Sequence, residues 1–139
     1  MKTFTLWFPV TPVPKGRPRF RRYGGAYTPP KTEEYERQIK NLYLTSPKRV
    51  EFEENVPLVV NLEFGMPIPK SMSKKKRAAM IEGDISHTKK PDVDNLVKAI
   101  LDGLNKLAWA DDSQIVRISA EKKYAKEPYV YLYVHEYIK

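Results

Sequence analysis

The chain of 139 residues contains no cysteine and only two histidines. Disulfide bonds and thiolate metal sites are therefore excluded, and nothing suggests an extracellular origin. Zinc chemistry is disfavoured because, of its usual ligands, cysteine is missing and histidine is scarce. A glycine-rich phosphate loop, an HExxH motif, internal repeats and low-complexity tracts are also absent.

No long hydrophobic run is present either. The opening segment, MKTFTLWFPV, is too short for a signal peptide or a membrane span and is quickly followed by prolines. We therefore expect a cytoplasmic protein with no membrane partner and no small-molecule cofactor. The length suits one domain over residues 1–139, and 41% hydrophobic residues suffice for one core.

Acidic residues are scarce at the start of the chain. Residues 1–50 hold 11 Lys and Arg against 3 Asp and Glu, a difference of +8, whereas residues 51–139 hold 14 of each. The whole net charge of +8 therefore lies in the first 50 residues. This asymmetry predicts a polyanionic partner, and the balanced remainder is unlike a ribosomal-type protein that is basic throughout.

Basic residues gather in two clusters, at 15–22 and 74–77, and also at 89–90, just before Asp92 and Asp94. If residues 15–21 are extended, the alternate side chains of this first cluster project to one face. We expect these cations to contact DNA phosphates. The candidate DNA-binding residues are Lys15, Arg17, Arg19, Arg21, Arg22, Lys74, Lys75, Lys76, Lys89 and Lys90.

Local patterns predict an α+β fold. Alternating or β-branched segments indicate strands at 3–8, 57–64, 114–123 and 129–137, with a hairpin turn at 23–27. Thr32 is the expected N-cap of one helix, and a second helix at 74–82 lies between Ser73 and Gly83. Apolar residues at helical spacing from Val93 to Leu107 indicate a third. Helices packed on a mixed or antiparallel sheet in a single domain are therefore expected.

The most informative segment is KKPDVDNLVKAILDG at 89–103, followed by Asp111 and Asp112. Asp94, Lys98 and Asp102 are spaced by four residues and predict a polar row on the outward helix face. Asp92 and Asp94 point to the same side only if residues 92–94 are still extended. A shared cation site therefore requires the helix proper to begin near Asp94.

A chain reversal after this helix would bring Asp111 or Asp112 back toward Asp92 and Asp94. Clustered carboxylates need compensation, which Mg²⁺ or Mn²⁺ supplies together with water and phosphate oxygens. Lys98 is placed to contact a scissile phosphate. An acidic cluster in a basic chain thus favours a metal-dependent phosphodiesterase that acts on nucleic acid.

Ordinary structural roles compete with this interpretation. Asp is common as a helix cap or in turns, and Lys98 could be a simple partner of Asp94 or Asp102. A calcium loop is excluded because Leu96 and Gly103 occupy positions that need oxygen ligands. An isolated histidine more often has a structural role than a role in substrate contact, although His87 lies near the acidic segment and could touch substrate.

The motif also resembles a known family. KPDVDNLVKAILDGLN followed by ADDSQIV is similar to the RusA family of Holliday junction resolvases, common in phages and prophages, and the likeness extends to VPKGRPRFRR, YTPPKTEEYE and SKKKRAAMIEGDISHTKKP. The resemblance implies a homodimer, dependent on Mg²⁺ with Mn²⁺ as a possible substitute, that nicks four-way DNA junctions symmetrically. By position it implies catalytic Asp92, Asp94, Asp112 and Lys98, with Asp92, Asp94 and Asp112 as metal ligands and Asp111 as either a further ligand or an orienting residue.

Other functions remain open at this point. A nuclease with a preference for flaps, replication forks or RNA–DNA hybrids would carry the same acidic residues, and a non-catalytic DNA-binding module would use them only as caps. Phe20, Tyr23 and Tyr27 are candidates for stacking on unpaired bases at the crossover, although we expect at least two of them to serve in packing.

Overall fold

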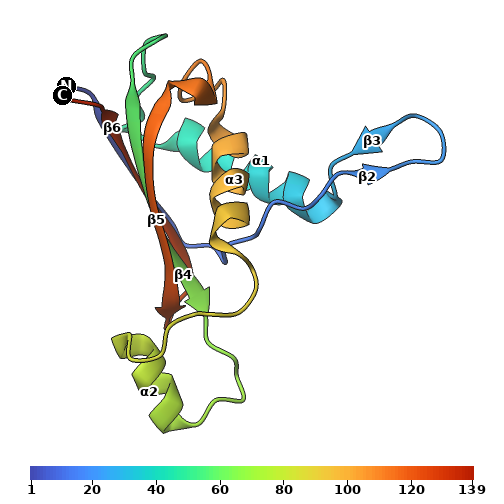
Figure 1. Ribbon diagram of the computed structural model, residues 1–139, viewed down its shortest axis with the longest axis vertical. Coiled ribbons are helices and arrows are strands. Elements are labelled where there is room, and N and C mark those ends of the chain that lie inside the picture. The colour runs from blue at the N-terminus through green and yellow to red at the C-terminus, as the bar shows by residue number, and fades with distance from the viewer.

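A four-stranded sheet in the order β1-β6-β4-β5 is the framework of the computed structural model, which describes residues 1–139 (Figure 1). The strands are β1 (Thr3–Phe8), β4 (Leu58–Pro67), β5 (Ile115–Ala125) and β6 (Tyr129–Glu136). β6 pairs antiparallel with β1 and β4, whereas β5 runs parallel to β4 at the sheet edge. The predicted α+β fold with a mixed sheet is thus confirmed.

Two helices cover one face of this sheet. α1 (Pro30–Thr45) and α3 (Val93–Leu104) pack against each other there, while α2 (Lys74–Glu82) lies apart, beyond the ends of β4 and β5 (Figure 1). Strand alternation decides which side chains meet the helices, as in β1, where Phe4, Leu6 and Phe8 are buried and their neighbours exposed. Residues of this kind form one core of 21 buried side chains.

α3 packs closely on α1 because a small residue, Gly103, lies between its large apolar side chains. Leu96, Ile100 and Leu104 are fully buried, and a Cβ added at Gly103 would lie 3.3 Å from Cγ2 of Ile39 on α1. The expectation that the helix extends to Leu107 is wrong, since α3 ends at Leu104. The residue that follows, Asn105, adopts a non-helical conformation at the C-cap.

The predicted N-cap of α1 is also wrong. α1 begins at Pro30 with Pro29 as its N-cap, because the fixed φ of proline suits the first turn of a helix. Thr32 is buried inside the first turn, where its Oγ1 accepts a hydrogen bond from the amide of Gly16 at 3.0 Å.

The prediction for α2 is confirmed at both ends. Ser73 Oγ accepts a hydrogen bond from the amide of Lys76, and Gly83 ends the helix in the left-handed conformation with φ of 87°. No helix in the structure combines the length and the apolar character needed to cross a membrane.

A second, two-stranded sheet extends away from this body. Its strands β2 (Arg19–Phe20) and β3 (Ala26–Tyr27) pair antiparallel and form the hairpin that the sequence predicted (Figure 1). Gly24 and Gly25 have φ of 100° and 80°, which most side chains disfavour and a tight turn requires.

The sheet face opposite the helices carries aromatic residues. Trp7 stacks on Tyr129 with ring centroids 4.2 Å apart, and Tyr129 Oη donates a hydrogen bond to Glu63 Oε1 at 2.7 Å. The ring of Tyr129 covers Gly65, where a Cβ would overlap Cε1 and Cδ1 of the tyrosine.

We expect Gly65→Ala to lower the free energy of unfolding by about 1–3 kcal/mol, because the held tyrosine ring must move to admit the methyl group. Urea denaturation measures the loss. In a Tyr129→Ala background the penalty of Gly65→Ala should largely disappear, and a penalty of the same size in both backgrounds would contradict the overlap as its cause.

Candidate active site

The acidic motif begins at the N-terminus of α3. Asp92 is the N-cap residue with φ of −72° and ψ of 144°, but its side chain makes no capping hydrogen bond. Both of its carboxylate oxygens instead lie 3.1 Å from Nζ of Lys90, at an exposed position. Asp94 is exposed in the first turn of the helix. The helix therefore begins one residue before Asp94. The carboxylate of Asp92 pairs with Lys90 and does not cap the helix, which was the alternative role considered for it.

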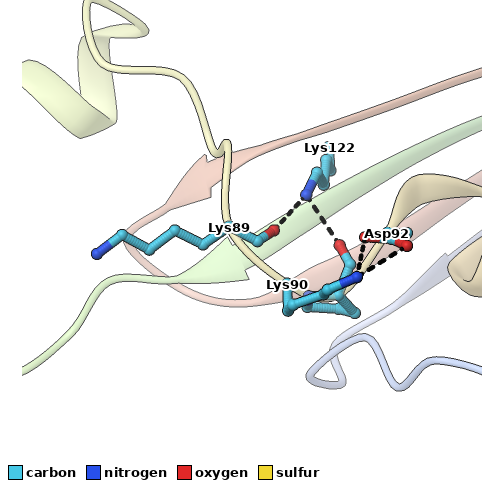
Figure 2. A network of polar contacts seen from close by, with 5 residues as sticks. Lys89, Lys90, Asp92 and Lys122 are labelled. Carbon is cyan, nitrogen blue, oxygen red and sulfur yellow. Dashed lines mark hydrogen bonds and ion pairs between the residues drawn. The ribbon is translucent and has the colours of Figure 1, made fainter.

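A lysine from the edge strand holds the loop that carries Asp92 (Figure 2). Nζ of Lys122 on β5 donates hydrogen bonds to the carbonyl oxygens of Lys89 at 2.6 Å and Pro91 at 2.8 Å. Both carbonyls lie within the three residues before Asp92, so one ammonium fixes the backbone that presents this carboxylate. Lys122 was not among the predicted site residues, because it is separated from the motif and its alternating strand gives no sign of a partner.

A second lysine joins the N-terminal segment to both helices. Nζ of Lys15 lies 2.6 Å from Oε1 of Glu36 on α1 and 3.1 Å from Oδ2 of Asp102 on α3. Burial alone would lower the pKa of Lys15, but the hydrogen bonds and charges of Glu36 and Asp102 outweigh it and raise the pKa. The amide of Lys15 also donates to the carbonyl of Asn95 at 2.9 Å, in the first turn of α3. Lys15, predicted to bind DNA, thus already has two carboxylate partners.

Asp112 lies at the other end of the motif and is half-buried. Its Oδ1 accepts a hydrogen bond from Nε1 of Trp109 at 2.7 Å, and its amide donates to Oδ1 of Asn105 at 3.1 Å. Burial raises the pKa of Asp112 despite the indole hydrogen bond; the negative charges of Asp102 and Asp111 add to the rise, whereas Lys98 opposes it. Trp109 was missed in the sequence, although a buried indole N–H needs an acceptor and Asp112 is only three residues away.

Asp111 serves as a cap rather than as a free carboxylate. It precedes a short 3₁₀ turn (Asp112–Gln114) and accepts a hydrogen bond from the amide of Ser113, in a capping box with Gln114. Hydrogen bonds from Ser113 hold the pKa of Asp111 below its ordinary value. Gln114 is buried and also donates to the carbonyls of Glu53 and Val56, which anchors the turn to the segment before β4.

The structure does not gather the predicted carboxylates into one cluster. No three Asp, Glu or His side chains lie close enough together to hold a metal ion. Asp92 and Asp94 lie at the start of α3, whereas Asp112 is influenced by Lys98 and Asp102 farther along the helix. Asp92 and Asp94 fit a cation by their chemistry, because Mg²⁺ commonly takes one or two carboxylates and completes its shell with water and phosphate oxygens. The larger ligand set stays a prediction.

The remaining basic candidates are exposed. The arginines at 17, 19, 21 and 22 lie on or beside the hairpin, and Lys74, Lys75 and Lys76 form the first turn of α2. Lys89 and Lys90 flank the start of the motif. His87 packs against Tyr124 with ring centroids 4.8 Å apart, and burial together with Lys122 and Lys89 lowers its pKa, which favours the neutral, structural role.

Carboxylates at a helix start, with a cationic segment fixed beside them, suit an enzyme that cleaves a polyanion, and a nuclease is the class that fits both features.

Comparison with known proteins identifies the kind of nuclease. The family described as Endodeoxyribonuclease RusA matches residues 9–135. The chain therefore belongs to the RusA family, as the motif predicted, and is an endodeoxyribonuclease. It is 37% identical to the uncharacterized protein YqaN of Bacillus subtilis (strain 168) over 129 residues, which cover 90% of each chain. It is 40% identical to the crossover junction endodeoxyribonuclease rusA of Lactococcus phage r1t over 72 residues, 51% of this chain and 48% of that protein.

We expect Lys15→Met to lower the free energy of unfolding by roughly 2 kcal/mol at neutral pH, because Glu36 and Asp102 lose their common cation while remaining partly buried. Urea denaturation at neutral pH measures the loss. Lys40→Met, at an exposed position on α1, is the control, and equal losses for Lys15→Met and Lys40→Met would argue against the network.

We expect Lys122→Met to lower the cleavage rate by about tenfold or more, because the loop that presents Asp92 loses the ammonium that fixes its carbonyls. Thermal unfolding should change little, since methionine keeps most of the packing of the stem. Lys123→Met is the matched control, because Lys123 lies next along β5 and pairs with Glu63 rather than with the loop. Equal effects of the two variants on cleavage would exclude a specific role of Lys122.

Proposed function

We propose that this protein is a Mg²⁺-dependent resolvase that cuts four-way DNA junctions by paired, symmetric nicks. The observation that carries the proposal is the acidic motif at the start of α3 in a chain that matches the RusA family over residues 9–135. The name of the phage relative, a crossover junction endodeoxyribonuclease, supports branched DNA as the substrate.

Each residue of the motif then has a part that its position allows. Asp92 and Asp94 are the proposed metal ligands, and their exposure leaves them open to an incoming cation and to DNA. When bound, Mg²⁺ would activate water and polarise the scissile phosphate. Lys98, exposed one turn after Asp94, would balance charge that develops on the phosphate.

Asp112 is the proposed third carboxylate. Its raised pKa shows that the folded protein disfavours its negative charge, and a nearby cation would relieve this. Asp111, engaged with Ser113, would orient the turn rather than bind metal, which is the second of the two roles considered for it.

We infer that the enzyme acts as a homodimer. A four-way junction has approximate two-fold symmetry, and two protomers related by a two-fold axis would place one active site on each of two matching strands. Manganese is expected to substitute for magnesium, because both are hard cations that accept carboxylate and water ligands.

We expect Asp94→Asn to reduce junction cleavage by about 100-fold or more, because an isosteric amide is a poor ligand for Mg²⁺. Junction binding in EDTA should persist or tighten, since one negative charge facing the phosphates is removed. The assay compares a synthetic mobile four-way junction, a flap and a linear duplex, each with Mg²⁺ or with EDTA.

Asp84→Asn is the matched control, because Asp84 is an exposed aspartate outside the motif. Retained cleavage by Asp94→Asn would refute the ligand role. Paired nicks confined to the junction support the resolvase, faster cutting of the flap would redefine the substrate, and binding without any Mg²⁺-dependent cleavage would indicate a DNA-binding module.

A further inference from the structure

The hairpin of β2 and β3 projects from the body of the molecule (Figure 1). We call residues 17–27, which comprise both strands and their approach and turn, the arm. Its strands contribute only two residues each, and a ribbon this short has little stability of its own. An element of this kind is suited to become ordered against a partner.

Two aromatic side chains on the arm face solvent. Phe20 and Tyr23 are each 82% exposed, and neither belongs to the hydrophobic clusters of the fold. The cross-strand neighbour of Phe20 is Ala26, so no large side chain covers the phenyl ring from the facing strand. The expectation that at least two of Phe20, Tyr23 and Tyr27 serve in packing is therefore wrong, because Phe20 and Tyr23 are both exposed.

The positive charges of the arm favour a polyanion as its binding partner. Arg17, Arg19, Arg21 and Arg22 are exposed, and the chain has no acidic residue before Glu33. The guanidinium of Arg21 lies over the ring of Tyr27, 4.9 Å from its centroid, and that of Arg22 lies 5.8 Å from the centroid of Tyr23. Cationic groups that alternate with exposed rings are typical of surfaces that bind single-stranded nucleic acid.

The root of the arm is fixed beside the acidic motif. The amide of Lys15 bonds to the carbonyl of Asn95, and the amide of Gly16 bonds to Oγ1 of Thr32. A Cβ at Gly16 would lie 2.7 Å from that hydroxyl, so the segment passes tightly against α1. Asn95 is the neighbour of Asp94, and the arm therefore extends outward from the start of α3.

We propose that Phe20 and Tyr23 stack on unpaired bases at the branch point and give the enzyme its preference for branched over linear DNA. In a duplex each base face is covered by its neighbours, whereas bases at an open crossover offer free faces to an aromatic ring. The arginines hold the adjoining phosphates, and the rings distinguish the branch. This inference rests on the proposed function and adds the residues that select its substrate.

Binding in EDTA tests the proposal without cleavage. Fluorescence anisotropy is recorded for the wild type, Phe20→Leu, Phe20→Trp and Tyr23→Leu on a four-way junction and on a linear duplex, over a series of salt concentrations. Phe20→Leu and Tyr23→Leu should each weaken junction binding by about tenfold and leave duplex binding unchanged. Phe20→Trp should retain junction binding, because it keeps a ring.

The salt dependence separates stacking from charge. Neither leucine variant removes a cation, so the slope of log affinity against log salt should stay at the wild-type value, whereas Arg21→Gln should flatten it on both DNAs. Tyr137→Leu is the matched control, since Tyr137 also lies against an arginine, Arg117, at 5.3 Å but is outside the arm. A junction containing 2-aminopurine at the branch should show fluorescence quenching with the wild type and less with Phe20→Leu.

Several outcomes would overturn the inference. Equal weakening on junction and duplex would mean groove or phosphate contact, and an effect of Tyr137→Leu as large as that of Tyr23→Leu would remove the arm from consideration. A leucine variant that changes the sedimentation coefficient but not DNA selectivity would place the arm against a second copy of the chain. If the wild type selects the junction through Phe20 yet never cleaves it, the proposed function fails and the arm assignment stands.

Discussion

The ammonium group of Lys15, held between Glu36 and Asp102, is the interaction on which the arrangement of the site depends. Both carboxylates are within 3.1 Å of it, and they belong to the two helices that cover the sheet. Two carboxylates at this depth need a cation between them, and the cation comes from the chain segment that leads to the arm. One charge therefore fixes α1 against α3 and sets where the arm leaves the body.

The rest of the site is built outward from α3. Its buried stripe and the close approach at Gly103 fix the helix against the core, while the loop before it is held from the sheet by Lys122. The exposed Asp94 and Lys98 thus lie on a rigid element, whereas Asp102, predicted to lie in the same outward row, is partly buried against Lys15. A nuclease benefits from this arrangement, because a metal ligand displaced by a fraction of an ångström loses much of its effect on the phosphate.

The carboxylates of the motif differ in their exposure to solvent and in the partners that already bind them. Asp94 is open to solvent, Asp92 is exposed but pairs with Lys90, Asp111 is occupied as a cap, and Asp112 is held by Trp109 in a setting that disfavours its charge. They also lie apart, at the start of α3 and in the turn before β5, and no three of them are close enough together to hold a metal ion. Residues that look equivalent in the sequence therefore have different roles.

The sequence by itself determined the elements whose signals are local. The 3.6-residue period placed the buried face of α3, Ser73 and Gly83 fixed both ends of α2, and the DVDN motif identified the family, because caps, periodicity and motifs involve neighbours in the chain. Only the tertiary structure decided which groups meet across the fold. Lys15 and Glu36 are 21 residues apart, and Lys122 and Lys89 are 33 apart. Thr32, predicted as a helix cap, instead accepts a hydrogen bond from the amide of Gly16. A lysine has the same local propensity whether its ammonium meets a carboxylate, a carbonyl or a phosphate, so its role is fixed only when distant segments of the chain come into contact.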